Sequence, residues 1–125
     1  MYNRSMKSSI AAFKYGARKE YGRYYAAELA KKHESWIKKT GAQALIPVPI
    51  HKERHKKRGY NQAKVIADYL EGETGIPVID DYLIRIKNTE ALKELSAAER
   101  KASLEDAFLV SETSKLLYRN LRCVI

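Results

Sequence analysis

The feature that most constrains the fold is a change of pattern within residues 44–70, which read ALIPVPIHKERHKKRGYNQAKVIADYL. Residues 44–48 are apolar and lie between Gly41 and Pro49, which predicts a short buried strand. After Gly59 the apolar residues recur with the spacing of one helical face: Ala63, Ile66, Ala67 and Leu70. A strand that leads into a helix is typical of an α/β fold.

Between this strand and this helix lies a strongly basic stretch, HKERHKKR, which we expect to be a loop. Glu53 is its single acid, and its cations are Lys52, Arg54, Lys56, Lys57 and Arg58. Free N–H groups and the dipole at a helix N-terminus attract anions, and cationic side chains add full charges. The stretch therefore predicts an anion-binding site, with Lys52, Arg54, Arg58 and Gly59 as its candidate residues.

Two other interpretations of the basic stretch stay open. A run of cations is often only a solvated surface. The spacing of His51 and His55 could also suit a metal ion, but no second cluster of ligands supports this, and the one cysteine, Cys123, lies far along the chain. Because open α/β sheets bind ligands at the carboxyl ends of their strands, we favour the anion site and expect no metal site.

The residues before this stretch predict two helices. Residues 2–14 carry Tyr2, Met6, Ile10 and Phe13 on one helical stripe that ends at Gly16. Residues 19–39 predict a longer helix that ends before Gly41, and four large residues follow one side of it: Tyr21, Tyr25, Leu29 and Trp36. These aromatic side chains could stack on nucleic-acid bases, but their helical spacing favours packing in the core.

The C-terminal half predicts further strands and one short helix. Residues 76–79 and 82–86 read as strands, with a turn or sheet-rim pair at Asp80 and Asp81, and the default connection between parallel strands is a right-handed crossover. Ser96 and Glu99 form a capping box that predicts a helix over residues 97–104. We expect a short apolar run at 107–110, a loop at SETSK and another strand at 121–125.

Composition limits the class of protein. The 125 residues fit a single domain, and the net charge of +9 points to an anionic partner such as a phosphorylated small molecule, nucleic acid or an acidic surface. One cysteine excludes an internal disulfide framework and fits a reducing cytoplasm. No apolar run approaches the roughly 20 residues of a membrane span, and no signal-peptide core is present, so we expect a cytoplasmic protein without membrane partners.

Three stretches resemble the ComF family of phosphoribosyltransferase-like proteins. The sequence PVPIHKERHKKRGYNQAKVIA is similar to the family's P-V-P, basic loop and R-G-[FY]-N-Q-[AS] pattern, which Arg58 to Ala63 match in type and spacing. FKYGARKEYGRYYAAELA resembles its upstream helical segment, and RIKNTEALKELSAAERKASLEDAF resembles its flexible loop. Two positions depart from the loop pattern, with Leu92 in place of Gln and Ser103 in place of Asn.

This resemblance implies a type I phosphoribosyltransferase-like α/β fold, in which helices flank a parallel, Rossmann-like sheet. Residues 1–43 would form an N-terminal helical segment, and residues 44–125 part of the phosphoribosyltransferase-like domain. The family strand at 121–125 leads into a loop that binds the 5-phosphate of phosphoribosyl pyrophosphate (PRPP), and this loop and an upstream zinc-binding cysteine cluster are absent here. We therefore expect these residues to be an incomplete domain and the parent protein to continue past Ile125. We expect the 125 residues alone not to catalyse turnover of PRPP.

By the same resemblance, the parent domain would bind PRPP or pyrophosphate with Mg²⁺ and transfer a phosphoribosyl group, whereas the fragment alone would bind no cofactor. Lys52, Arg54 and Arg58 would neutralise the pyrophosphate, with Arg58 the leading candidate, and Gly59 would admit the anion closely. Residues 85–95 would be a flexible lid, with Arg85, Lys87 and Thr89 facing the ligand. The alternatives are an accessory protein of DNA uptake that binds single-stranded DNA, and an inactive relative. A strand edge left unpaired would favour self-association.

Overall fold

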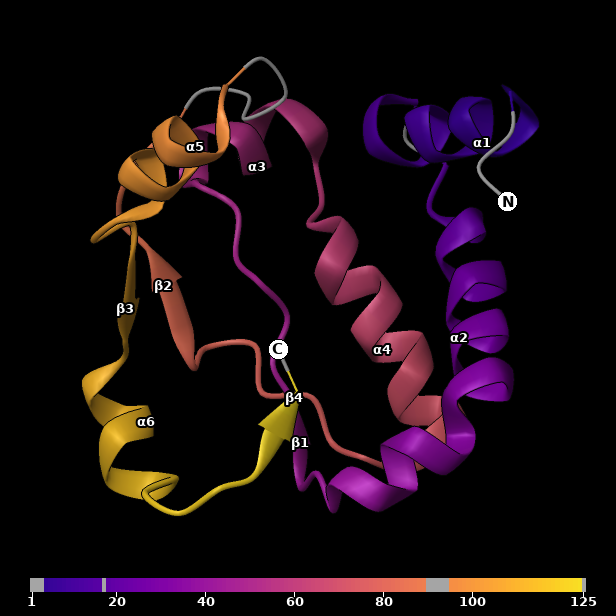
Figure 1. Cartoon of the computed structure of the whole chain (residues 1–125), viewed down its shortest axis with the longest axis vertical. Coiled ribbons are helices and arrows are strands. Elements are labelled where there is room, and N and C mark those ends of the chain that lie inside the picture. Colours follow the sequence, from indigo (N-terminus) through magenta and orange to yellow (C-terminus); the bar gives the residue numbers. More distant parts are fainter. Residues whose placement is uncertain (1–3, 17, 90–94, 125) are drawn as a thin grey trace.

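The computed structural model describes residues 4–16, 18–89 and 95–124, and the statements below refer to these residues. They contain six helices and four short strands in a mixed order (Figure 1). The elements are α1 (Arg4–Tyr15), α2 (Glu20–Thr40), β1 (Ala44–Leu45), α3 (Lys52–Arg58), α4 (Gln62–Thr74), β2 (Leu83–Arg85), α5 (Ala97–Leu104), β3 (Phe108–Val110), α6 (Glu112–Leu117) and β4 (Cys123–Val124).

The long helices α2 and α4 lie side by side and form the main helical layer (Figure 1). Small residues make this contact: α2 buries Gly22 and Ala26, and α4 buries Ala67. The predicted aromatic stripe of α2 is therefore only partly correct. Leu29 and Trp36 were expected in the core, but they are 41% and 56% exposed, because the two helices approach through their small side chains instead.

The predicted strand at residues 44–48 forms the centre of a small parallel sheet, although β1 itself is only two residues long. β1 pairs in parallel with β4, and Leu45 also bridges in parallel to Val78 from the predicted strand at 76–79. Pro47 and Pro49 lack the N–H group that a longer ladder needs, which explains why β1 ends early. The chain remains buried at Ile46, which is 2% exposed.

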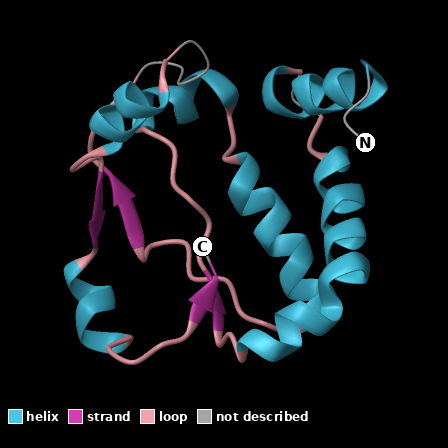
Figure 2. Cartoon of the chain, viewed as in Figure 1, coloured by secondary structure: helices cyan, strands magenta, loops and turns pink. Residues whose placement is uncertain are grey.

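The other two strands form an antiparallel pair, whereas we expected a single parallel sheet. β2 pairs with β3 in the register Leu83↔Val110, Ile84↔Leu109 and Arg85↔Phe108. The Ile86 N–H donates to the Ala107 carbonyl at 2.8 Å and extends this pair. Figure 2 shows the two strand pairs as separate units. The expectation of one continuous parallel sheet is therefore wrong for this part of the chain.

The basic stretch is a helix and not the loop that we expected. In α3 the His51 side chain accepts a hydrogen bond from the Glu53 N–H, and Gly59 ends the helix with a φ of 79°. Glu53 lies in the first turn and four basic residues lie in the last, so the side-chain charges complement the helix dipole at both ends. Lys, Arg and Glu also favour helix, and this propensity outweighs the charge repulsion.

The segment after β3 gives one more correction, and α5 gives a confirmation. SETSK was expected to be a loop, but it begins α6, because the Ser111 side chain accepts a hydrogen bond from the Ser114 N–H at 3.1 Å. By contrast, α5 spans Ala97–Leu104 with both hydrogen bonds of the predicted capping box. Bends at residues 80–82 agree with the predicted turn.

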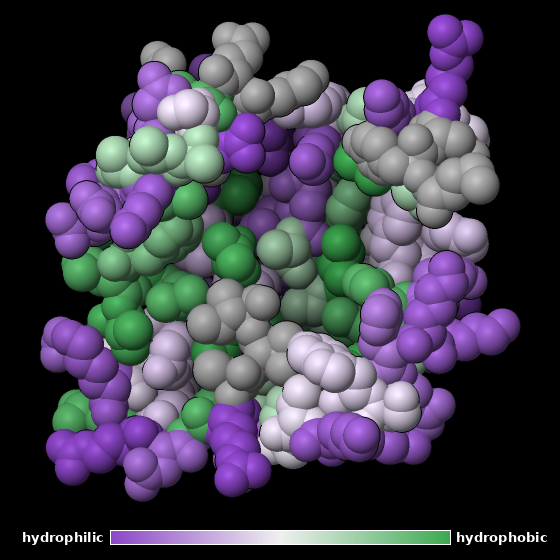
Figure 3. Space-filling view, viewed as in Figure 1, coloured by the Kyte–Doolittle hydropathy of each residue, from purple (hydrophilic) through white to green (hydrophobic). Residues whose placement is uncertain are grey.

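The buried apolar residues are spread over the helices, the parallel strand β1 and the residue before β3. They are Phe13, Ala26, Ala44, Leu45, Ile46, Tyr60, Ala67 and Ala107. On the face shown in Figure 3, apolar side chains gather over the strands and α4, and hydrophilic side chains surround them. Among the described residues, no helix combines the length and apolar character that crossing a membrane requires. The fold is mixed helix and sheet, and its division at residue 43 stays a prediction.

Candidate anion-binding site

Two arginines from separate elements meet at Thr89. Arg54 lies on α3, and one of its guanidinium nitrogens donates to the Thr89 carbonyl oxygen. Arg85 ends β2, and its guanidinium donates to the Thr89 hydroxyl. Thr89 is 9% exposed, so both contacts lie close to the protein interior. The sequence placed Arg54 in the anion site and Arg85 and Thr89 in the lid, and the structure brings all three together.

Neighbouring contacts fix the segment that carries Thr89. Asn88 donates to the Glu53 carboxylate at 2.5 Å and so ties this segment to α3. Lys87 donates to the Glu105 carbonyl oxygen at 2.7 Å, at the end of α5. The Nε of Arg85 donates to the Lys87 carbonyl at 3.2 Å. The segment 86–89 is thus held between α3 and α5, and Figure 1 shows both helices at the same end of the molecule.

The electrostatics of this cluster favour an anion. Burial lowers the pKa of Arg85, and the nearby positive charge of Arg54 lowers it further. Among the described residues, no carboxylate forms an ion pair with either arginine, and both donate to neutral oxygens of Thr89. Two guanidinium groups that repel each other are stabilised by a shared anion, which guanidinium can bind through two parallel hydrogen bonds.

Lys52 lies beside this cluster, in a shallow groove of about 310 Å³ that it lines together with Arg85. Backbone and side chains from three other places complete the groove: Pro49, Ile50, Asp80, Asp81, Leu83, Ile84, Ser111 and Thr113. Asp80 lies 3.4 Å from the Lys64 ammonium, which also binds Asp68. The pKa of Lys64 is raised, mainly by its hydrogen bond with Asp68. Asp80 lies in the turn before β2, and its ion pair with Lys64 connects this turn to α4.

Arg58 and Gly59 lie apart from the arginine cluster. The Arg58 guanidinium donates to the Gln62 side-chain oxygen at 3.0 Å and lies 5.2 Å from the centroid of the Tyr15 ring. Gly59 ends α3, and no atom lies within 4 Å of the position that a Cβ would take. Their predicted role in pyrophosphate binding stays a prediction, and the structure gives Arg58 other partners.

The lid is described only in part. Arg85, Lys87 and Thr89 are described and are tied down by the contacts above. Residues 90–94 of the predicted lid, with the departure at Leu92, lie outside the described residues. We expected the three described residues to face a ligand, and two of them, Arg85 and Thr89, contact each other and lie with Arg54, a candidate residue of the predicted anion site.

In the described part of the chain, no group of three or more His, Cys, Asp or Glu side chains could hold a metal ion. His51 instead accepts the Glu53 N–H at 3.4 Å as the N-cap of α3. The Mg²⁺ implied by the resemblance stays a prediction.

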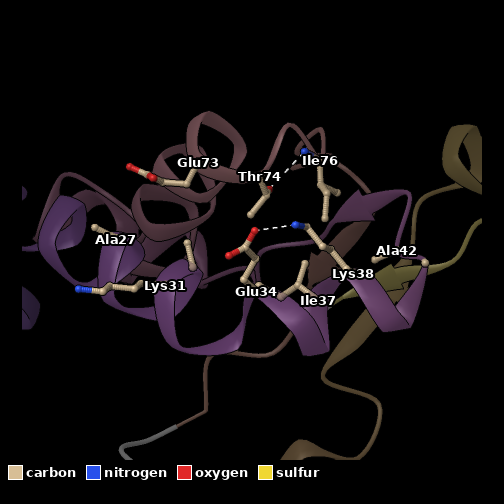
Figure 4. A pocket seen from close by; sticks show the side chains of 11 residues that line it. Ala27, Lys31, Glu34, Ile37, Lys38, Ala42, Glu73, Thr74 and Ile76 are labelled. Atoms are coloured by element: carbon tan, nitrogen blue, oxygen red, sulfur yellow. Dashed lines mark hydrogen bonds and ion pairs between the residues drawn. The ribbon is translucent and has the colours of Figure 1, made fainter.

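A second groove, of about 470 Å³, lies between the C-terminal halves of α2 and α4 (Figure 4). Two of its charged side chains bind each other: the Lys38 ammonium lies 2.6 Å from the Glu34 carboxylate, and this hydrogen bond lowers the pKa of Glu34. The Thr74 hydroxyl is also used, because it donates to Leu70 and accepts the Ile76 N–H. Lys31 and Glu73 also line this groove.

Sequence reasoning missed how α3 joins the segment after β2. The contact between Glu53 and Asn88 and the convergence of two arginines on Thr89 link residues that are more than 30 positions apart. No short-range pattern reports such a contact. The available signal was chemical, because two basic clusters that each suit a phosphate are expected to share one ligand.

Two curated proteins resemble the chain. It is 35% identical over 83 residues to Competence protein F of Haemophilus influenzae, which covers 66% of this chain and 36% of that protein. It is 29% identical over 93 residues to Competence protein ComFC of Bacillus subtilis, which covers 74% of this chain and 36% of that protein. The chain thus spans about a third of the length of these relatives. No family model matches the chain, and no solved structure matches it significantly.

Proposed function

Because the chain belongs to the ComF family, as its similarity to two competence proteins over about 70% of its length supports, we propose that it binds the pyrophosphate group of PRPP. The convergence of Arg54 and Arg85 on Thr89 carries this proposal. The chain would form part of a phosphoribosyltransferase-like protein that acts in competence. We expect the 125 residues alone to bind the ligand without transferring the phosphoribosyl group.

The arrangement suits a ligand with two linked phosphates. Each guanidinium offers a planar set of donors, and the Thr89 oxygens that now accept their hydrogen bonds can give way to phosphate oxygens of the same geometry. Lys52 lies in the adjoining groove and adds a further charge. Such groups stabilise the charge that develops on pyrophosphate when it leaves the ribose.

Calorimetry with pyrophosphate and with PRPP, each with Mg²⁺, tests this function. Arg54→Ala and Arg85→Ala should each weaken binding by about 1.5–3 kcal/mol, the range for hydrogen bonds to charged groups. Arg54→Lys keeps the charge but loses the planar pair of donors, and we expect it to bind with intermediate affinity.

Arg23→Ala is the matched control, because it removes one positive charge from an exposed site on α2. Each variant is first checked by circular dichroism and thermal unfolding, so that affinities are compared only between folded proteins. If Arg54→Ala and Arg85→Ala bind pyrophosphate as well as Arg23→Ala does, the two arginines form no anion site.

A second candidate function is binding of single-stranded DNA, which the net charge of +9 and the competence proteins among the relatives favour. Affinity for single-stranded DNA should fall with salt, with a logarithmic slope of about −0.7 for each phosphate contacted. A steep slope with DNA, together with no measurable binding of pyrophosphate, would favour this second function over the first.

A further inference from the structure

The segment after α3 binds the C-terminal end of α1. The Tyr60 hydroxyl donates to the Phe13 carbonyl oxygen, and the Gln62 side-chain nitrogen donates to the Lys14 carbonyl oxygen at 3.0 Å. Arg58 lies 5.2 Å from the Tyr15 ring centroid and donates to the Gln62 side-chain oxygen at 3.0 Å. Three alternate residues of the sequence RGYNQ therefore meet three successive residues of α1.

These contacts supply hydrogen-bond donors to carbonyl oxygens at the C-terminal end of α1. The last four carbonyl oxygens of an α-helix have no donor within the helix. The last helical bond of α1 runs from the Gly16 N–H to the Ala12 carbonyl at 2.8 Å, so the carbonyls of Phe13 and Lys14 need other donors. Tyr60 and Gln62 supply them, and the Arg58 cation suits the negative end of the helix dipole.

Tyr60 is the buried member of this group. It is 5% exposed, and its ring lies 6.2 Å from the Phe13 ring, centroid to centroid. Burial raises the pKa of its hydroxyl, so the group remains protonated and able to donate near neutral pH. The Lys19 ammonium lies 5.1 Å from the centroid of the same ring. Tyr60 thus holds α1 both by packing and by a hydrogen bond.

Elsewhere α1 has little apolar contact. Phe13 is its one buried residue within the described part of the chain, and Met6 is 41% exposed. The Ser9 hydroxyl lies 2.5 Å from the Tyr25 hydroxyl and gives α1 a polar contact with α2. A helix of 12 residues is marginal by itself in water, so tertiary contacts must keep α1 folded.

We propose that Arg58, Tyr60 and Gln62 form a clasp that holds α1 in place and that α3 couples this clasp to the arginine cluster. α3 carries Arg58 at its end and, one turn earlier, Arg54, which reaches Thr89. Glu53 on the same helix binds Asn88. Because both sets include contacts made by one helix of seven residues, a shift of α3 at one set moves the other. The coupling to an anion rests on the proposed function, whereas the clasp does not.

Amide hydrogen exchange of α1 tests the clasp. Tyr60→Phe combined with Gln62→Ala removes both donors but keeps the buried ring, and we expect the exchange of the α1 amides to become at least tenfold faster. Amides of α2 and α4 should keep their rates. Tyr24→Phe is the control, because this residue is 64% exposed and its hydroxyl forms no hydrogen bond within the described residues. Unchanged α1 exchange in the double variant would overturn the clasp.

Inorganic pyrophosphate tests the coupling. In the unaltered chain, saturating pyrophosphate should slow the exchange of α1 amides severalfold, and the double variant should lose this effect while still binding pyrophosphate by calorimetry. Equal slowing in both proteins, or no slowing in the unaltered chain once pyrophosphate is bound, would overturn the coupling. If pyrophosphate does not bind the unaltered chain at all, the proposed function and the coupling both fail, and the exchange rates without ligand still decide the clasp.

Discussion

At the scale of single residues, glycine sets how closely α2 approaches α4. A Cβ built on Gly22 would lie 2.5 Å from the Val65 Cγ1 and 3.4 Å from the Phe13 Cε2. Gly72, near the end of α4, has no atom within 4 Å of the same position. Two glycines within helices therefore have opposite roles, since one is required by packing and the other is not.

Alanine at these two positions should change stability in opposite directions. Gly22→Ala should lower the free energy of unfolding by about 1–3 kcal/mol, because the added methyl group overpacks a tight contact between helices. Gly72→Ala should raise it by about 0.5–1 kcal/mol, because alanine favours the helix and meets no neighbour. Urea denaturation of both variants measures this difference. If both substitutions stabilise the protein, the close contact at Gly22 does not exist.

At the scale of elements, α5 depends on its first turn. The Glu99 N–H donates to the Ser96 hydroxyl at 3.3 Å, and the Ser96 N–H donates to the Glu99 carboxylate at 2.7 Å. α5 has no buried residue, so little packing supports it. A helix of this kind is stabilised mainly by its cap.

Ser96→Ala should destabilise α5 by about 1 kcal/mol, because alanine cannot accept the Glu99 N–H. Amide exchange within α5 measures the change, and β1 and α4 should keep their rates. Ser103→Ala, in the interior of the same helix, is the control and should leave the exchange of α5 unchanged or slower. Faster exchange in Ser103→Ala than in Ser96→Ala would contradict the role of the cap.

The acid titration of Glu99 gives a second measurement of the same cap. The pKa of Glu99 lies below its ordinary value of 4.5, mainly because its carboxylate accepts the Ser96 N–H. A lowered pKa in the folded state contributes stability that is present above pH 4.5 and is lost as the pH falls through the folded pKa. Below pH 4.5 the exchange of the α5 amides should therefore speed up more in the unaltered chain than in Glu99→Gln, whose side chain does not titrate. The same pH dependence in both proteins would mean that the Glu99 carboxylate has no part in the cap.

Elements with strong local signals could be predicted from the sequence, whereas those that depend on tertiary contacts could not. The capping box gave the bounds of α5, and Gly41 gave the end of α2, because both signals lie within a few residues. α3 was missed because its charge suggested a loop and outweighed the helix propensity of its residues. The antiparallel pairing of β2 with β3 depends on register across many residues, and no local pattern contains it.

The candidate site was predicted in its parts but not in its assembly. Arg54 was chosen because cations suit phosphate, and Arg85 and Thr89 because they lie in the stretch that resembles the family's flexible loop. Their meeting requires α3 to lie against the segment after β2, which the sequence does not report. Arg58 was placed in the site by its position before α4, yet the structure orients it toward Tyr15 and Gln62.

At the scale of the whole molecule, two groups of elements share few bonds. One group holds α2, α4 and the parallel strands, and the other holds β2, β3 and α6 (Figure 1). The polar contacts between them include the pair of Lys64 with Asp80, and both of these side chains are more than 40% exposed. Exposed ion pairs contribute little to stability, so the second group is held mainly through the contacts of α3 with Asn88 and Thr89.

We therefore expect the β2–β3 pair to open at a lower free energy than α2 and α4. Native-state hydrogen exchange at increasing denaturant should show the amides of β2 and β3 merging into one sub-global opening before those of α4. The Lys64→Met variant removes the ion pair with Asp80. It should lower the free energy of this opening further and leave the exchange rates of the α2 amides unchanged. A single opening free energy shared by all of these elements would contradict the division into two groups.

The parallel pairing of β1 with β4 also sets an order on folding. Ala44 pairs with Cys123, so nearly all of the 125 residues must be made before this ladder can close. The hydrogen-bonded contacts of α2 and α4 are local, and contacts close in sequence form sooner than distant ones, because closing a long loop costs more entropy. During synthesis on a ribosome, the helical pair can therefore assemble, and Leu45 can bridge to Val78, while β1 still lacks β4. For that interval the edge of β1 that will pair with β4 stays open to other strands.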